Sequence, residues 1–299
     1  MSDRSSAAVP PRVATSGLVL LAVTSVSWGL SWPITKYVIS QWPPLPARGL
    51  TGVAGALTLF AIAWLRGDSL AVPRSQRLRL VISAFFNVTV WMAVMGLALL
   101  WLPAGETAVI AYTMPVWTAL LAWPLLGERM TLLRVLALAM AFGGIVALLG
   151  AHGFAASVAK LPGVLLALSG AVGFALGTIF LKRFPIALPG TTSAAWQIGI
   201  GSFPVVVIGL AFEVPQLDAL SPLGWAGLVY LIVIQFCVAY LCWFAAVQRL
   251  PASVAAIGTM AVPVIGVVAS AIALHEPLSL GQIAALVLTL AGVALATRS

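Results

Sequence analysis

Long apolar blocks separated by short polar turns run along the chain from residue 17 onward. Cutting the sequence at clusters of charge, proline and glycine leaves ten blocks of 19–25 residues. Each is long enough to cross about 30 Å of hydrocarbon as an α-helix. The pattern therefore predicts an all-α polytopic membrane protein with ten transmembrane helices. The blocks are 17–37, 46–65, 79–100, 103–126, 131–150, 162–182, 192–212, 223–247, 251–274 and 279–297.

Composition supports the same fold class. The chain is 62% hydrophobic and only 7% charged, whereas an average soluble domain is about 25% charged. The linkers leave no room for a soluble domain. Residues 1–16 are polar and rich in serine and proline, which predicts a disordered cytoplasmic tail. The first apolar block is too long for the core of a signal peptide, so we expect it to remain as the first span.

The distribution of basic residues predicts the orientation. The net charge is +8. In a soluble protein it would suggest a nucleic-acid partner, but in a membrane protein it sets topology. With the N-terminus in the cytoplasm, all but three of the 15 Lys and Arg residues face the cytoplasm, the exceptions being Lys36, Arg48 and Lys160. The positive-inside bias therefore predicts a bacterial-type inner-membrane protein with both termini in the cytoplasm.

Short motifs recur at an offset of 148 residues. Leu102-Pro103-Ala104 matches Leu250-Pro251-Ala252, Pro115 matches Pro263, and Glu128 matches Glu276. Each copy holds five predicted helices, an odd number, so the second copy enters the membrane from the opposite side. The sequence predicts two inverted five-helix repeats, over 17–150 and 161–297, as in many secondary transporters.

Some of these motifs also characterise a known family. Trp28-Gly29 is followed by Lys36 at the end of the first span. The fourth span of each repeat contains proline and ends in Leu-x-Glu, and a glycine-rich fifth span follows. In these features the chain resembles EamA-type members of the drug/metabolite transporter superfamily, and within it YddG-type exporters of aromatic and other amino acids. The resemblance implies alternating access through a central cavity lined by the first, third, fourth, sixth, eighth and ninth spans.

Two amides lie about halfway along apolar blocks. Asn87 and Gln235 are 148 residues apart, which is the offset of the repeat. A polar side chain in the membrane interior is costly unless it faces protein or water. The pair either lines a central cavity or ties neighbouring helices together, and its symmetric placement favours the cavity.

Aromatic residues lie at similar depth. Trp91 lies one turn beyond Asn87, on the same helix face. A cavity lined by aromatic rings and a few polar groups suits an aromatic or amphipathic solute. Packing between helices is the alternative for each of them. The other mid-span candidates are Trp28, Trp32, Tyr112, Trp117, Tyr240 and Trp243.

Prolines interrupt three spans. Pro33, Pro115 and Pro263 lie in the first, fourth and ninth spans, where a missing N–H donor favours a kink. Such kinks serve either as gating bends or as static curvature.

Near span ends, Lys36 is a candidate to attract a carboxylate, or it snorkels to the interface. Glu106 is a candidate for a substrate amine or a proton, or it faces extracellular water.

Glu128 and Glu276 precede Thr131 and Ser279, which we expect to be N-caps of the following helices. A carboxylate near a helix N-terminus interacts favourably with the helix dipole. We therefore interpret both glutamates as structural.

These features predict an exporter of small metabolites, foremost aromatic and other amino acids, with weak or no ion coupling. Multidrug efflux is an alternative. Exchange of sugar phosphates or nucleotide sugars requires several cavity cations, whereas Lys36, Arg48 and Lys182 lie near span ends. A structural or assembly role is the alternative outside transport.

The sequence holds no H-E-x-x-H or G-x-S-x-G motif and no paired mid-span carboxylates, so we expect no enzyme activity. Its two cysteines and two histidines form no metal-ligand motif, and we expect no metal and no cofactor. The expected partners are the lipid bilayer and a small-molecule substrate, with the protein a monomer or weak homodimer.

Overall fold

The computed structural model describes residues 14–150 and 154–297, and within these ranges the chain is helical with short connections. In this described part of the chain, nine helical segments are long and apolar enough to cross a membrane, and α14 is shorter, at 17 residues. Each predicted block lies on one helix or on consecutive helices. Of the predicted tail, residues 1–13 lie outside the described residues, and α1 already begins at Thr15.

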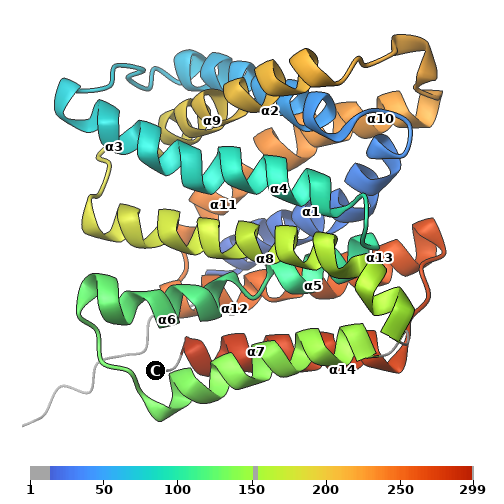
Figure 1. Ribbon diagram of the computed structural model, residues 1–299. Coiled ribbons are helices and arrows are strands. Elements are labelled where there is room, and N and C mark those ends of the chain that lie inside the picture. The colour runs from blue at the N-terminus through green and yellow to red at the C-terminus, as the bar shows by residue number, and fades with distance from the viewer. Residues whose placement is uncertain (1–13, 151–153, 298–299) are drawn as a thin grey trace, which may run out of the picture.

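The helices run roughly along one axis and connect alternately at the two ends of the bundle (Figure 1). The first half contains α1 (Thr15–Ile39), α2 (Pro44–Leu65), α3 (Arg74–Ala84), η1 (Phe85–Val90), α4 (Trp91–Ala98), α5 (Ala104–Ala111), α6 (Met114–Leu126) and α7 (Leu132–Gly150). The second half contains α8 (Phe154–Arg183), α9 (Gly190–Phe212), η2 (Leu217–Ala219), α10 (Pro222–Tyr230), η3 (Leu231–Val238), α11 (Ala239–Val247), α12 (Ala252–Thr259), α13 (Ala261–Leu274) and α14 (Leu280–Ala296).

Contacts between the two halves hold the bundle together. Helix α2 packs along α9 at one edge, and α7 packs along α14 at the opposite edge (Figure 1). Glycines permit the first contact, because a Cβ at Gly49 would lie 2.5 Å from the backbone nitrogen of Val206. Between these edges, α1 packs on α11 and α13, while α8 packs on α4 and α6. Small residues commonly allow such close approach between membrane helices.

Two helical segments change hydrogen-bond register midway. Both η1 and η3 are π-helical, and each continues without a gap into the α-helix that follows it. Asn87 lies in η1 and Gln235 in η3, so the offset that relates the two amides also relates the two irregular segments. Short π-helical segments are rare and frequently mark functional sites.

Two further interruptions share the same offset. Helix α5 ends before Tyr112, and α12 ends before Met260, 148 residues later. Pro115 and Pro263 follow these breaks, as expected because a proline cannot donate to the carbonyl four residues earlier. In contrast, α1 runs through Pro33 as one continuous helix, and the kink expected there stays a prediction.

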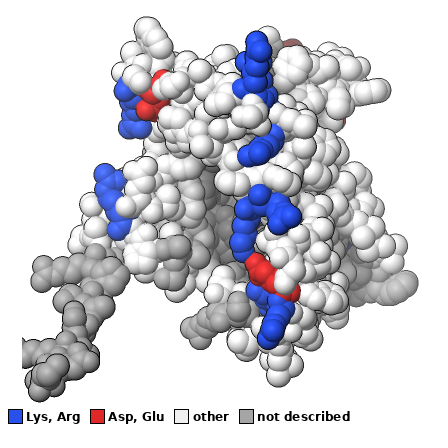
Figure 2. All heavy atoms as spheres, turned by 90° about the vertical axis from the view of Figure 1, so that its left-hand side faces the viewer, with Lys and Arg blue, Asp and Glu red and all other residues white. Residues whose placement is uncertain are grey.

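Basic residues gather at one end of the bundle. Figure 2 shows this face, where Lys and Arg side chains form a column and the surface is hollowed beside it. We call it the basic end; the Lys and Arg residues of the helix ends and connections on this side are Arg66, Arg74, Arg77, Arg79, Arg129, Arg134, Lys182, Arg183 and Arg249. The remaining described Lys and Arg residues, Lys36, Arg48 and Lys160, lie toward the opposite end.

Helix α8 begins earlier than predicted. The sequence places a linker before residue 162, but α8 starts at Phe154 and contains Pro162. A proline inside a helix often kinks the helix without ending it, because the helix bends to accommodate the ring. The proline signal therefore misplaced this boundary.

Candidate functional site

A cavity of about 140 Å³ lies in the middle of the bundle. Side chains from α1, α2, α4, α6, α8, α9 and α11 line it, together with both π-helical segments and Tyr112. Among the predicted site residues, the lining includes Trp28, Trp32, Asn87, Trp91, Tyr112, Gln235 and Tyr240. Helix α2 and helix α9 contribute Arg48 and Ile198, which the sequence did not predict. The lining as described includes no residue of α12 or α13, so the expected contribution of the ninth span stays a prediction.

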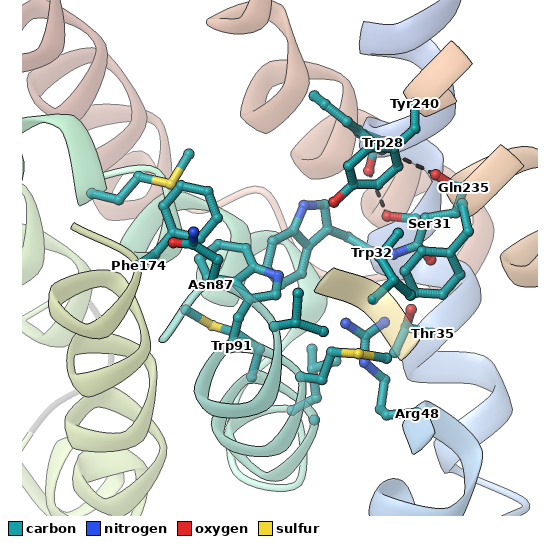
Figure 3. A pocket seen from close by; sticks show the side chains of 18 of the residues that line it. Trp28, Ser31, Trp32, Thr35, Arg48, Asn87, Trp91, Phe174, Gln235 and Tyr240 are labelled. Carbon is teal, nitrogen blue, oxygen red and sulfur yellow. Dashed lines mark hydrogen bonds between the residues drawn. The ribbon is translucent and has the colours of Figure 1, made fainter. Parts of the chain in front are cut away.

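Aromatic rings form most of the cavity wall. The rings of Trp32 and Trp91 are 6.3 Å apart, and Trp91 is 5.2 Å from Phe174. On the other side, Trp28 meets Tyr240 edge to face at 5.5 Å. Edge-to-face pairs at these distances are mutually stabilising. The wall is thus a rigid apolar surface able to hold a ring or an aliphatic chain (Figure 3).

Arg48 is the unexpected polar group of this cavity. It lies one turn inside α2 and is only 5% exposed. Gly96 of α4 leaves space for it, because a Cβ there would lie 3.1 Å from the Arg48 Cγ. In Figure 3 the side chain reaches from α2 toward Trp32 and Thr35. Arg48 is thus near the start of its span, as the sequence indicates, but its side chain is buried beside the cavity, which the sequence did not predict.

The two amides contribute the remaining mid-span polarity. The Oδ1 of Asn87 and the Oε1 of Gln235 are buried and lack a partner among the described residues. Asn87 packs against α8, where a Cβ at Gly177 would lie 2.0 Å from its Oδ1. The backbone carbonyl of Gln235 accepts a 3.4 Å hydrogen bond from Trp28 Nε1. Both side chains face the cavity and also contact neighbouring helices.

Other predicted site residues lie elsewhere. Trp117 donates to Thr113 Oγ1 at 3.1 Å and packs on Phe142 of α7. Trp243 packs against Trp28 at 5.8 Å, outside the cavity lining. Their positions agree with the packing alternative. Pro33, Pro115 and Pro263 are likewise absent from the lining residues.

Polar contacts join helices at the end opposite the basic end. Lys36 donates to the carbonyls of Leu99 and Leu102, which follow α4. Glu276 accepts hydrogen bonds from the backbone nitrogens of Ala104 and Gly105 at 2.7 and 3.0 Å. The dipole interaction expected for Glu276 therefore involves α5, not the following helix, whose N-cap is Ser279.

Glu106 belongs to the same end. Its Oε1 lies 2.7 Å from Lys160 Nζ, and the glutamate side chain is 3% exposed. A buried carboxylate paired with a lysine is not exposed to extracellular water, so that alternative is wrong. The cavity lining, as far as the structure describes it, contains neither residue.

At the basic end, Glu128 joins α7 and α8 through ion pairs with one residue of each helix. Its carboxylate lies 2.6 Å from Lys182 Nζ and 2.7 Å from Arg134 Nη2. The hydrogen bond from Lys182, followed by that from Arg134, lowers the pKa of the Glu128 carboxyl below its usual value. Thr131 Oγ1 accepts from the Arg134 backbone nitrogen at 3.3 Å, as expected for an N-cap.

A family comparison identifies the chain. The model of the EamA-like transporter family matches residues 15–150 and again residues 161–298. The chain belongs to the EamA-like transporter family. With its apolar helices, it is thus a multi-pass membrane transporter, and the resemblance seen in the sequence motifs is confirmed at the level of the family.

Individual relatives agree with this assignment. The chain is 32% identical over 293 residues to the uncharacterized transporter YvbV of Bacillus subtilis strain 168, covering 94% of this chain and 91% of the relative. It is 26% identical over 289 residues to an uncharacterized transporter of Archaeoglobus fulgidus, covering 94% and 98% of the two chains. A solved crystal structure of another protein matches with a TM-score of 0.65 at 24% identity, over 95% of this chain and 98% of that one. The last similarity concerns the fold alone.

Proposed function

We propose that this EamA-family transporter exports small metabolites, foremost aromatic and other amino acids, by alternating access through the central cavity. The observation that carries the proposal is the cavity itself, whose aromatic wall surrounds buried Arg48 and the buried side-chain oxygens of Asn87 and Gln235. Apolar surface with a few convergent polar groups is typical of small-molecule sites. Its place midway along the helices is where secondary transporters bind their solutes.

The orientation follows from the basic end. Lys and Arg residues favour the cytoplasmic side of membrane proteins, so the basic end faces the cytoplasm and both termini lie there. This orientation needs ten spans, the last being α14. Its 17 residues extend about 25 Å as a helix, at the short end of the range for transmembrane helices. The proposed location is a bacterial-type inner membrane, and the bias of Lys and Arg toward one end supports a cytoplasmic side there.

The two halves act as inverted repeats over residues 17–150 and 161–297. Their irregular features support this proposal: the π-helical segments η1 and η3, and the breaks at Tyr112 and Met260, are each related by 148 residues. Similar halves of opposite orientation can exchange conformations, which gives two states of comparable energy. The cavity then opens to each side in turn.

The contacts at the two ends support a cytoplasm-facing state. Lys36, Glu106 and Glu276 tie helices together at the outer end, whereas the cytoplasmic face is hollowed (Figure 2). Solute enters from the cytoplasm, and release requires the outer contacts to break. No acidic residue lines the described cavity, so export is facilitated or weakly coupled. The carrier works as a monomer or weak homodimer.

Counterflow in proteoliposomes tests this function. Purified protein is reconstituted with unlabelled amino acids inside, and uptake of a trace of labelled amino acid is followed across a panel that includes cationic drugs. We expect saturable accumulation of amino acids, reduced in Asn87→Ala and Gln235→Ala. Accumulation of drugs alone would favour multidrug efflux instead. Uptake no faster than in protein-free vesicles for every solute would refute a carrier.

A further inference from the structure

The Arg48 guanidinium is a buried cation without a counter-ion among the residues that the structure describes. Its Nε is inaccessible and has no hydrogen-bond partner in the described structure. Among the residues described, no carboxylate forms an ion pair with Arg48, and the cavity lining contains neither Asp nor Glu. The neighbouring cations differ, because Lys160 pairs with Glu106 and Lys36 donates to two carbonyls.

Such an arrangement is costly for a residue that only supports the fold. Removing a charge from water costs several kcal/mol unless a partner restores its interactions. A buried arginine whose sole function was packing could be replaced by an apolar side chain of the same length without loss of stability. Its position beside a cavity therefore points to a partner that arrives from solution.

The cavity defines the chemistry of that partner. One guanidinium offers paired N–H donors that match a carboxylate in a bidentate geometry. A phosphate dianion or a nucleotide would call for several cations, whereas Arg48 is the one Lys or Arg among the lining residues. The volume of about 140 Å³ compares with the cavity of about 150 Å³ that accommodates benzene in an engineered protein core.

We infer that the cavity binds a small monocarboxylate, with its carboxylate on Arg48 and its apolar part against Trp32 and Trp91. This inference rests on the proposed transport function and names the group that selects the solute. Zwitterionic amino acids and simple organic acids share this chemistry. Neutral analogues of the same shape lack the group that Arg48 recognises.

Matched ligand pairs separate charge from shape. Binding to purified protein is measured by tryptophan fluorescence, since Trp28, Trp32 and Trp91 line the cavity. The probes are benzoate against benzamide, and L-phenylalanine against L-phenylalaninol. The variants are Arg48→Met, which keeps side-chain length, Arg48→Lys, which keeps charge, and the exposed control Arg249→Met.

We expect wild type and Arg249→Met to bind each carboxylate at least tenfold more tightly than its analogue without a carboxylate, which is neutral for benzamide and carries only the ammonium group for L-phenylalaninol. Arg48→Met should lose this preference, and Arg48→Lys should retain part of it. Thermal unfolding checks that each variant folds, and we expect Arg48→Met to be at least as stable as wild type because it removes a buried charge. Should Arg48→Met fail to fold, Arg48→Lys and the wild-type preference decide the question.

Three outcomes overturn the inference. The wild type binds neither carboxylate, or it binds each carboxylate no more tightly than its analogue, or Arg48→Met keeps the wild-type preference. Counterflow separates these failures from failure of the transport function. If flux is saturable but binding does not favour the carboxylates, the protein is a carrier without a carboxylate site at Arg48. Absence of flux for every solute removes the carrier itself.

Discussion

Gly177 positions the Asn87 amide in the cavity wall, and enlarging it should disturb both the fold and the solute site. A Cβ at residue 177 would lie 2.0 Å from the Asn87 Oδ1, 2.7 Å from its Cγ and 3.0 Å from the Phe86 Cβ. No real Cβ contact is this short, so the amide must move. In Gly177→Ala we therefore expect solute flux to fall in the same direction as in Asn87→Ala.

The cost can be estimated from the contact. Overpacking by one methyl group typically destabilises a close-packed site by about 1–3 kcal/mol. In the double variant Asn87→Ala/Gly177→Ala the clashing oxygen and carbon are gone, and only the 3.0 Å approach to Phe86 Cβ remains. In the cycle formed with Asn87→Ala, we expect the double variant to be about 1–2 kcal/mol more stable than the sum of the two single changes, a coupling typical of residues in direct contact.

Gly173 provides a matched control one turn away on α8. Its added Cβ would meet a methyl carbon of Val90 at 2.8 Å, and that side chain can adjust. The thermal unfolding midpoints of Gly177→Ala, Asn87→Ala, the double variant and Gly173→Ala are compared in one detergent. The reasoning is refuted if Gly177→Ala is as stable as Gly173→Ala, or if removing the Asn87 amide brings no recovery.

Three further changes test the contacts at the two ends. Glu276→Gln removes the charge from two hydrogen bonds to the N-terminus of α5, and we expect a loss of about 1–3 kcal/mol, read as a lower unfolding midpoint. Glu106→Gln leaves Lys160 without its carboxylate in a mostly buried pair. We expect the free energy of unfolding to fall by about 3–5 kcal/mol and to be partly restored by adding Lys160→Met. At Glu128 the folded-state pKa is lowered, so its contribution is present above the unfolded pKa of about 4.3 and is lost as pH falls below it. An unfolding midpoint measured against pH should therefore decline on acidification, and less steeply in Glu128→Gln.

Hydrophobic patterning was sufficient to predict the membrane fold. Each apolar block became helix, because block length and the absence of charge leave few alternatives in a bilayer. The sequence favoured a cavity for Asn87 and Gln235, since a mid-span amide is tolerated only beside protein or water. The mid-span aromatics were candidates for the same cavity or for packing between helices, and five of the seven lie in its lining.

The remaining features depend on which side of a helix faces inward. Arg48 was assigned to a span end because its sequence position is one turn from Pro44, yet the side chain extends inward past Gly96. A glycine at position 96 offers no signal for this in the sequence. Likewise, the π-helical register of η1 and η3 leaves no compositional trace, because each lies within an ordinary apolar run.

Exposure of the cavity to both sides of the membrane in turn is the central claim, and a single cysteine tests it most directly. Ser31 lines the cavity, and Ser31→Cys is placed in a protein whose Cys237 and Cys242 are replaced by alanine. A membrane-impermeant maleimide is added to one side of oriented proteoliposomes at a time. We predict labelling from either side, with prior labelling from one side blocking the other. Labelling from one side only, whatever solute is present, would contradict alternating access.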